Sequence, residues 1–111
     1  HNTILLFNPK YFLMNILVQN ANGTSRFSPP SGSSCWFDYW QKHKGQLTAA
    51  RYSCPACGEA HAKSDFCGAH VTKVFSTDKK NYIVPICRSC NQRTDSFQIE
   101  VNLLLNVPSN L

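Results

Sequence analysis

The segments CPACG (residues 54–58) and CRSCN (residues 87–91) each carry two cysteines in a C-x-x-C spacing. A tight turn brings residues i and i+3 together, so each segment offers two sulfur ligands, and two such pairs complete the tetrahedral set that zinc prefers. Gly58 lets the backbone fold back after the first pair, with its amides toward sulfur. The sequence therefore predicts one structural zinc ion bound by Cys54, Cys57, Cys87 and Cys90.

Other interpretations of the cysteines are weaker. Three disulfides would need an oxidising compartment, and the sequence has no clear secretion signal. A redox-active C-x-x-C would lie in a thioredoxin-like βαβ pattern, which is absent, and it would leave the second pair unexplained. Of the two remaining cysteines, we expect Cys35 to pack with an aromatic helix. We expect Cys67 to be a small buried residue, with a stand-in metal ligand as the alternative.

The composition is that of one small domain with a basic surface. The chain has 111 residues, of which 42% are hydrophobic and 15% charged, so a metal would usefully supplement its core. Eleven basic residues against six acidic ones give a formal net charge of +5, which suits a polyanion such as nucleic acid. The same balance also serves solubility in many small domains, and no extended block of lysine and arginine occurs.

We expect three parts along the chain. Residues 1–13 precede Met14, a plausible natural start, and are interpreted as an upstream remnant; residues 14–34 form a short strand and a Ser/Pro/Gly-rich loop. Residues 35–111 form a single zinc-bound domain, in which the leucines of a C-terminal tail cover apolar surface. No apolar run is long enough to span a membrane, and we expect a cytoplasmic protein.

The segment SSCWFDYWQKHKGQ (residues 33–46) predicts a helix, begun by Ser33 or Ser34 as cap and ended by Gly45. Its aromatic side chains recur at helical spacing on one face. Such a stripe is usually core packing, although aromatic rings can also stack on nucleic-acid bases. The stripe consists of Trp36, Tyr39, Trp40 and His43.

Between and after the cysteine pairs we expect a polar loop over 59–66, a hairpin of strands 69–75 and 81–86, and a short helix over 87–95. A last strand covers 97–102. A knuckle, a hairpin and a helix that begins at the second pair make a treble clef, and a helix N-terminus stabilises thiolates. The expected fold class is a small α+β treble-clef zinc domain with an N-terminal aromatic helix.

The order of CPACG, then GAHV (residues 68–71), then YIVPICRSCNQR (residues 82–93) resembles the HNH endonucleases, whose ββα-metal motif is often built into a treble clef. The resemblance covers about residues 51–95. It implies that His70, at the start of the first hairpin strand, is the general base that activates water for attack on a DNA phosphodiester. It further implies that Asn81 orients this histidine.

The resemblance also implies a second metal, Mg²⁺ or another divalent cation, with Asn91 as one ligand. Ala69 stands where the family commonly has an aspartate or histidine ligand, so another residue must supply it. Candidates in the loop over 59–66 are Glu59, His61 and Asp65.

Three functions are therefore open. The first is a metal-dependent DNA endonuclease. The second is a non-catalytic module of the same fold that binds nucleic acid, with DNA favoured, through basic residues that contact phosphates: Lys73, Lys79, Lys80, Arg88 and Arg93. The third is a protein-interaction module that uses the aromatic helix and the zinc scaffold.

Overall fold

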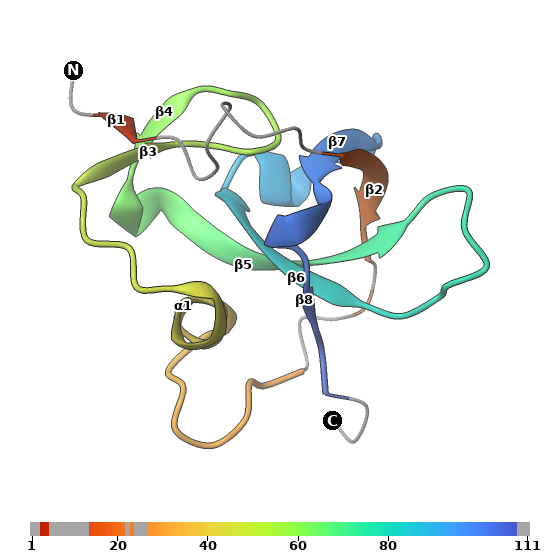
Figure 1. The fold of residues 1–111 in the computed structure, drawn as a ribbon, viewed down its shortest axis with the longest axis horizontal. Coiled ribbons are helices and arrows are strands. Elements are labelled where there is room, and N and C mark those ends of the chain that lie inside the picture. The colour runs from red at the N-terminus through yellow and green to blue at the C-terminus, as the bar shows by residue number, and fades with distance from the viewer. Residues whose placement is uncertain (1–2, 5–13, 22, 24–26, 109–111) are drawn as a thin grey trace.

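The computed structural model describes residues 3–4, 14–21, 23 and 27–108 and shows a small α+β fold with one α-helix in these ranges. Its sheets have the strand orders β1-β3-β4 and β7-β2-β5-β6-β8, and all neighbours are antiparallel except β1 and β3 (Figure 1). The elements are β1 (Thr3–Ile4), β2 (Asn15–Asn20), α1 (Trp36–Lys44), β3 (Arg51–Ser53), β4 (Ala60–Ala62), β5 (Phe66–Lys73), β6 (Tyr82–Cys87), β7 (Phe97–Glu100) and β8 (Leu105–Asn106), with the 3₁₀ turns η1 (Lys63–Asp65), η2 (Cys90–Gln92) and η3 (Val101–Leu103).

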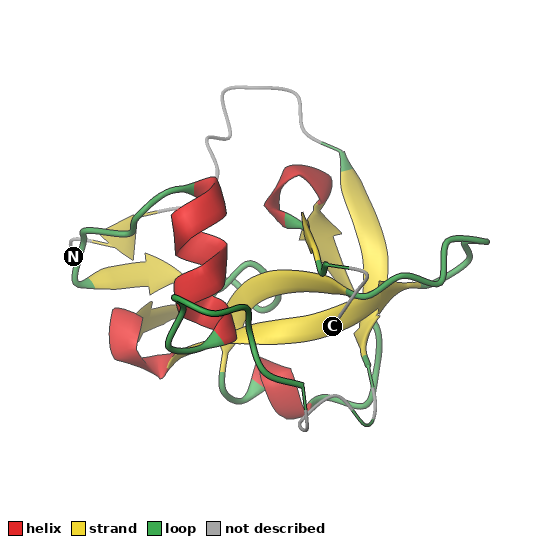
Figure 2. Cartoon of the chain, turned by 90° about the horizontal axis from the view of Figure 1, so that it is seen from below, coloured by secondary structure: helices red, strands yellow, loops and turns green. Residues whose placement is uncertain are grey.

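The predicted aromatic helix is confirmed as α1, which covers one face of β5 and β6 (Figure 2). Trp36, Tyr39 and Trp40 are buried, so these three stripe residues pack in the core as expected, whereas His43 is exposed. The indole Nε1 of Trp40 donates to the carbonyl of Leu103 at 2.8 Å and ties the helix to the C-terminal segment.

The ends of α1 differ in part from the prediction. Gly45 ends the helix with φ at 135°, and its amide donates to the carbonyl of Gln41 at 2.9 Å. The N-cap is Cys35 and not a serine, because the Cys35 sulfur accepts from the Asp38 amide at 3.4 Å. Cys35 is therefore exposed instead of packed with the aromatic face.

The β5–β6 hairpin is confirmed, but β5 begins at Phe66 and its ladder runs from Phe66–Cys87 to Val71–Tyr82. His70 consequently lies within β5, not at its start. Gly68 allows α1 to approach this strand, since a Cβ there would be 2.4 Å from the backbone nitrogen of Phe37. This close approach lets the aromatic rings of the helix pack directly on the hairpin.

The predicted loop over 59–66 is wrong, because β4 and η1 form there and β4 pairs with β3. The predicted helix over 87–95 is also wrong: only η2 forms, and Arg93 is already extended. The side-chain amide of Asn20 donates to the carbonyls of Cys90 and Arg93 at 2.9 and 3.0 Å. These carbonyls would accept from residues 94 and 97 in a continued helix. The described residues after the second cysteine pair thus lack the helix of a treble clef.

The C-terminal prediction is confirmed in its main point. Leu103 and Leu104 are buried, and β8 pairs with β6. β8 pairs only with Tyr82 and Ile83 of β6. Pro85 has no amide hydrogen to donate, but it lies beyond this pairing and so removes no hydrogen bond to β8.

The proposed remnant over 1–13 falls largely outside the described residues, apart from β1, which pairs with β3. Positions 22 and 24–26 of the predicted loop lie outside them as well. In the part of the chain that is described, no helix is long and apolar enough to cross a membrane.

Candidate metal centre

Two tight turns present the four predicted cysteine ligands. The first joins β3 to β4: the Cys54 amide donates to the Glu59 carbonyl at 2.8 Å, and the Gly58 amide donates to the Cys54 carbonyl at 2.7 Å. Gly58 has φ at 78°, a conformation that side chains disfavour. The second turn begins at Cys87, where β6 ends, and closes with the Arg93 amide donating to the Cys90 carbonyl at 3.1 Å.

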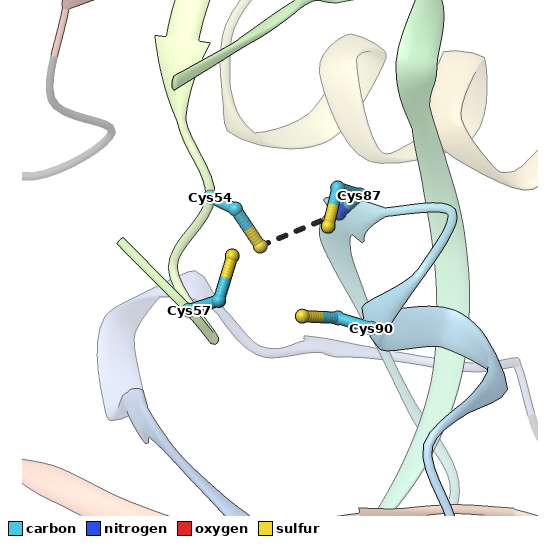
Figure 3. Close-up of side chains that lie close together, drawn as sticks. All are labelled: Cys54, Cys57, Cys87 and Cys90. Carbon is cyan, nitrogen blue, oxygen red and sulfur yellow. Dashed lines mark hydrogen bonds between the residues drawn. The ribbon is translucent and has the colours of Figure 1, made fainter. Parts of the chain in front are cut away.

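The structure brings the four sulfurs together, as Figure 3 shows. All four Sγ atoms lie within 4.8 Å of one another, and they form the one group of three or more such ligands found among the described residues. A tetrahedral zinc with Zn–S bonds of about 2.3 Å would hold its sulfurs about 3.8 Å apart, so only a small contraction is needed. Three of the cysteines are buried and Cys57 is exposed, which leaves one side open for metal entry.

The surroundings of the sulfurs favour a bound cation. Backbone amides of Ala56 and Cys87 donate to the Cys54 sulfur, each at 3.4 Å, and such bonds stabilise a thiolate. Burial, and next the charge of Cys54, raise the pKa of the Cys90 thiol. Several thiolates this close repel one another unless a positive ion lies between them. The four cysteines therefore fit a metal ion, and zinc is consistent with an all-sulfur set.

His70 lies in a different environment. Its side chain is 8% exposed, and its ring lies 4.8 Å from the ring of Trp36 in an edge-on contact and 6.2 Å from that of Phe27. Its Nε2 is buried with no hydrogen-bond partner among the described residues, and burial lowers the pKa of the imidazole. His70 thus faces α1, and no metal-ligand group of the described residues includes it.

The residues predicted to act with His70 lie elsewhere. The exposed side chain of Asn91, in η2, lies beside Cys67. Cys67 and His70 are three positions apart in β5, and so their side chains point to opposite faces of the sheet. Asn81 precedes β6, and its carbonyl accepts from the Val107 amide at 3.3 Å. The structure records no hydrogen bond from either asparagine to His70 among the described residues.

Two of the candidate loop ligands pair with each other. His61 Nδ1 lies 2.7 Å from an Asp65 carboxylate oxygen, and Arg88 Nε lies 3.7 Å from the other oxygen. Glu59 is exposed and belongs to no metal-ligand group in the described part of the chain. Cys67, next to this cluster, is partly buried, and burial raises the pKa of its thiol. His61 and Arg88 therefore both contact the Asp65 carboxylate at the surface.

The five predicted phosphate contacts divide into two groups. Lys73 pairs with Asp78 at 3.3 Å, Arg88 pairs with Asp65, and Arg93 pairs with Asp95 at 2.6 Å. Lys79 and Lys80 are exposed and form no ion pair within the described residues. They lie in the connection between β5 and β6, which projects from the sheet (Figure 1).

Sequence reasoning missed Asn20, whose amide shapes the second cysteine turn, and Gly68. For Gly68, the only indication in the sequence was a glycine within a strand pattern. Comparison of the chain with protein-family models, with curated proteins and with solved structures finds no match.

Proposed function

We propose that this protein is a zinc-stabilised module that binds nucleic acid, DNA above all, without hydrolysing it at His70. The observation that carries the proposal is the projecting β5–β6 hairpin, whose lysines at positions 79 and 80 have no carboxylate partner among the described residues, in a chain of net charge +5. Free cations on an exposed loop suit phosphate, since binding releases counterions from the nucleic acid.

The metal centre would support this role by holding the base of the hairpin rigid. Cys87 ends β6 and pairs with Phe66 at the base of the hairpin. A zinc ion held by Cys87 and the three other cysteines would clamp this base to the β3–β4 turn. The opposite end, with its lysines, would then be presented on a rigid support, which lowers the entropic cost of binding. A reducing compartment such as the cytoplasm would keep these cysteines available as thiolates.

An HNH-like endonuclease is a second candidate, favoured by the order of the cysteine pairs around the hairpin. It would require the His70 imidazole to reach a water next to phosphate. Trp36 and Phe27 pack against that ring instead, and Asn91 lies on the other side of β5. These contacts favour binding over cleavage.

Fluorescence anisotropy of labelled oligonucleotides across a salt series tests the proposal. We expect affinity to fall steeply with added salt. Replacing both Lys79 and Lys80 with glutamine should weaken binding and reduce the salt slope by about one for each lysine. Lys44→Gln is the control, because Lys44 is also an exposed lysine and lies at the end of α1, away from the connection between β5 and β6 (Figure 1). Equal effects of the two replacements would contradict the role of the hairpin.

A plasmid-nicking assay with Mg²⁺, Mn²⁺ and Ni²⁺ separates the two candidates. We expect no cleavage by the zinc-loaded protein. Cleavage that disappears in His70→Ala, while the zinc content and the circular dichroism spectrum are unchanged, would establish the endonuclease and refute a purely binding role.

A further inference from the structure

The most unusual side chain of the described surface is Phe75, at the point where the β5–β6 hairpin leaves the sheet. Its side chain is 95% exposed, whereas Met14, the other exposed large hydrophobic residue, is 64% exposed. Phe75 is also the one non-glycine residue of the described chain with a positive φ, at 55°. This conformation costs a bulky L-residue roughly 1–2 kcal/mol. Backbone strain of this kind concentrates at sites that bind or react with ligands.

The connection that carries Phe75 is well braced. The Asp78 carboxylate accepts from the Tyr82 hydroxyl and from the Lys80 amide, and it pairs with Lys73. The Lys73 ammonium also lies 4.7 Å from the centre of the Tyr82 ring. The Asp78 amide in turn donates to the Ser76 hydroxyl at 3.0 Å. The phenyl ring of Phe75 takes no part in this network. It is exposed to solvent and does not stabilise the loop.

The charges in the connection that carries Phe75 indicate the chemistry of a partner. Asp78 is engaged by Lys73, whereas Lys79 and Lys80 have no ion pair among the described residues. An exposed aromatic ring in the same connection as these lysines suits a polyanion that offers flat apolar faces, which is single-stranded nucleic acid. Duplex bases already stack on one another, and separating them costs a few kcal/mol. A membrane surface would require a wider apolar face than a single ring.

We propose that Phe75 stacks on an unpaired base of single-stranded nucleic acid while Lys79 and Lys80 contact the neighbouring phosphates. This inference rests on the proposed nucleic-acid-binding function and specifies its ligand. The braced loop orders the segment that carries Phe75 before binding, which reduces the ordering cost. A protein or lipid partner would use the ring for its apolar surface alone, and that difference is measurable.

The test measures binding of the zinc-loaded full chain to labelled oligo(dT), oligo(rU) and the matching DNA duplex at low salt. Stacking of one base on an aromatic ring contributes about 1–3 kcal/mol, so Phe75→Ala should weaken oligo(dT) binding about 5- to 150-fold. Phe75→Leu, which keeps an apolar side chain but no ring, should lose about as much, and Phe75→Trp should retain binding. Met14→Ala is the matched control and should change nothing, because it removes an exposed apolar side chain elsewhere.

The outcomes are distinguishable. If the wild type binds oligo(dT) and Phe75→Ala binds equally well, the stacking role is refuted while the proposed function stands. Preference for duplex over single strands, or full binding by Phe75→Leu, also overturns it, and vesicles of anionic lipid then test an apolar contact. A wild type that binds none of the nucleic acids refutes both proposals. Thermal unfolding should show that every variant is folded, since Phe75 is exposed and does not belong to the hydrophobic core.

Discussion

The contact between α1 and β5 predicts a large effect of one methyl group. In Gly68→Ala the new Cβ would lie 2.4 Å from the Phe37 nitrogen and 2.4 Å from the Trp36 carbonyl carbon. Ordinary contacts begin near 3.4 Å, so the helix must retreat by about 1 Å, because both clashing atoms are backbone and cannot rotate away. This shift separates Trp36 and Trp40 from the hairpin. Overpacking of a core typically costs 1–3 kcal/mol, and we expect about 3 kcal/mol or more here.

Chemical denaturation followed by circular dichroism, with zinc in excess, measures this free energy of unfolding. Gly32→Ala is the control: its Cβ would meet no atom within 4 Å, and only its φ of 97° disfavours a side chain. Its cost should therefore be roughly 1–2 kcal/mol. A loss below about 1 kcal/mol for Gly68→Ala would refute the reasoning, because it would mean that α1 does not rest directly on the β5 backbone.

Three further predictions concern the metal, the buried histidine and the second cysteine turn. Cys90→Ser or a strong chelator should remove zinc and unfold the domain, since structural zinc contributes about 10–16 kcal/mol in small domains. Native mass spectrometry measures the bound zinc, and circular dichroism measures the fold. The control Cys35→Ser lies outside the cluster and can still cap α1, so this variant should keep one zinc. Burial lowers the pKa of His70 below its ordinary 6.5, so the unfolded chain takes up this proton first and stability should fall as the pH drops below about 6.5. In His70→Phe this part of the decline should vanish, and denaturation curves of the two proteins with parallel pH profiles would contradict the burial of the imidazole. Asn20→Ala removes the side-chain donor to the carbonyls of Cys90 and Arg93, of which only the Cys90 carbonyl keeps another donor among the described residues, the Arg93 amide. It should cost about 1–3 kcal/mol, with weaker zinc binding in a competition titration. Replacing the exposed neighbour Gln19 with alanine should have little effect on either quantity.

Part of the candidate site was predictable from local spacing alone. The two C-x-x-C segments define their own turns, and the structure gathers their four sulfurs as expected. The α1 helix and the β5–β6 hairpin could also be predicted. The aromatic residues of α1 recur at the helical period, and the β-branched and aromatic residues of β5 and β6 flank a polar turn. These features depend on neighbours in the sequence, which is the reason they could be identified without coordinates.

The tertiary structure decided the backbone conformation after the second cysteine pair and the surroundings of His70. Asn20 lies 70 residues before Cys90, yet its amide takes the carbonyls that a helix would have used. Trp36 and Phe27 pack on an imidazole that the sequence order had suggested for catalysis. Both results come from contacts between distant segments, whose geometry is set by how α1 and β2 pack on β5. A local pattern specifies which side chains are available, whereas only the packed chain determines what each one faces.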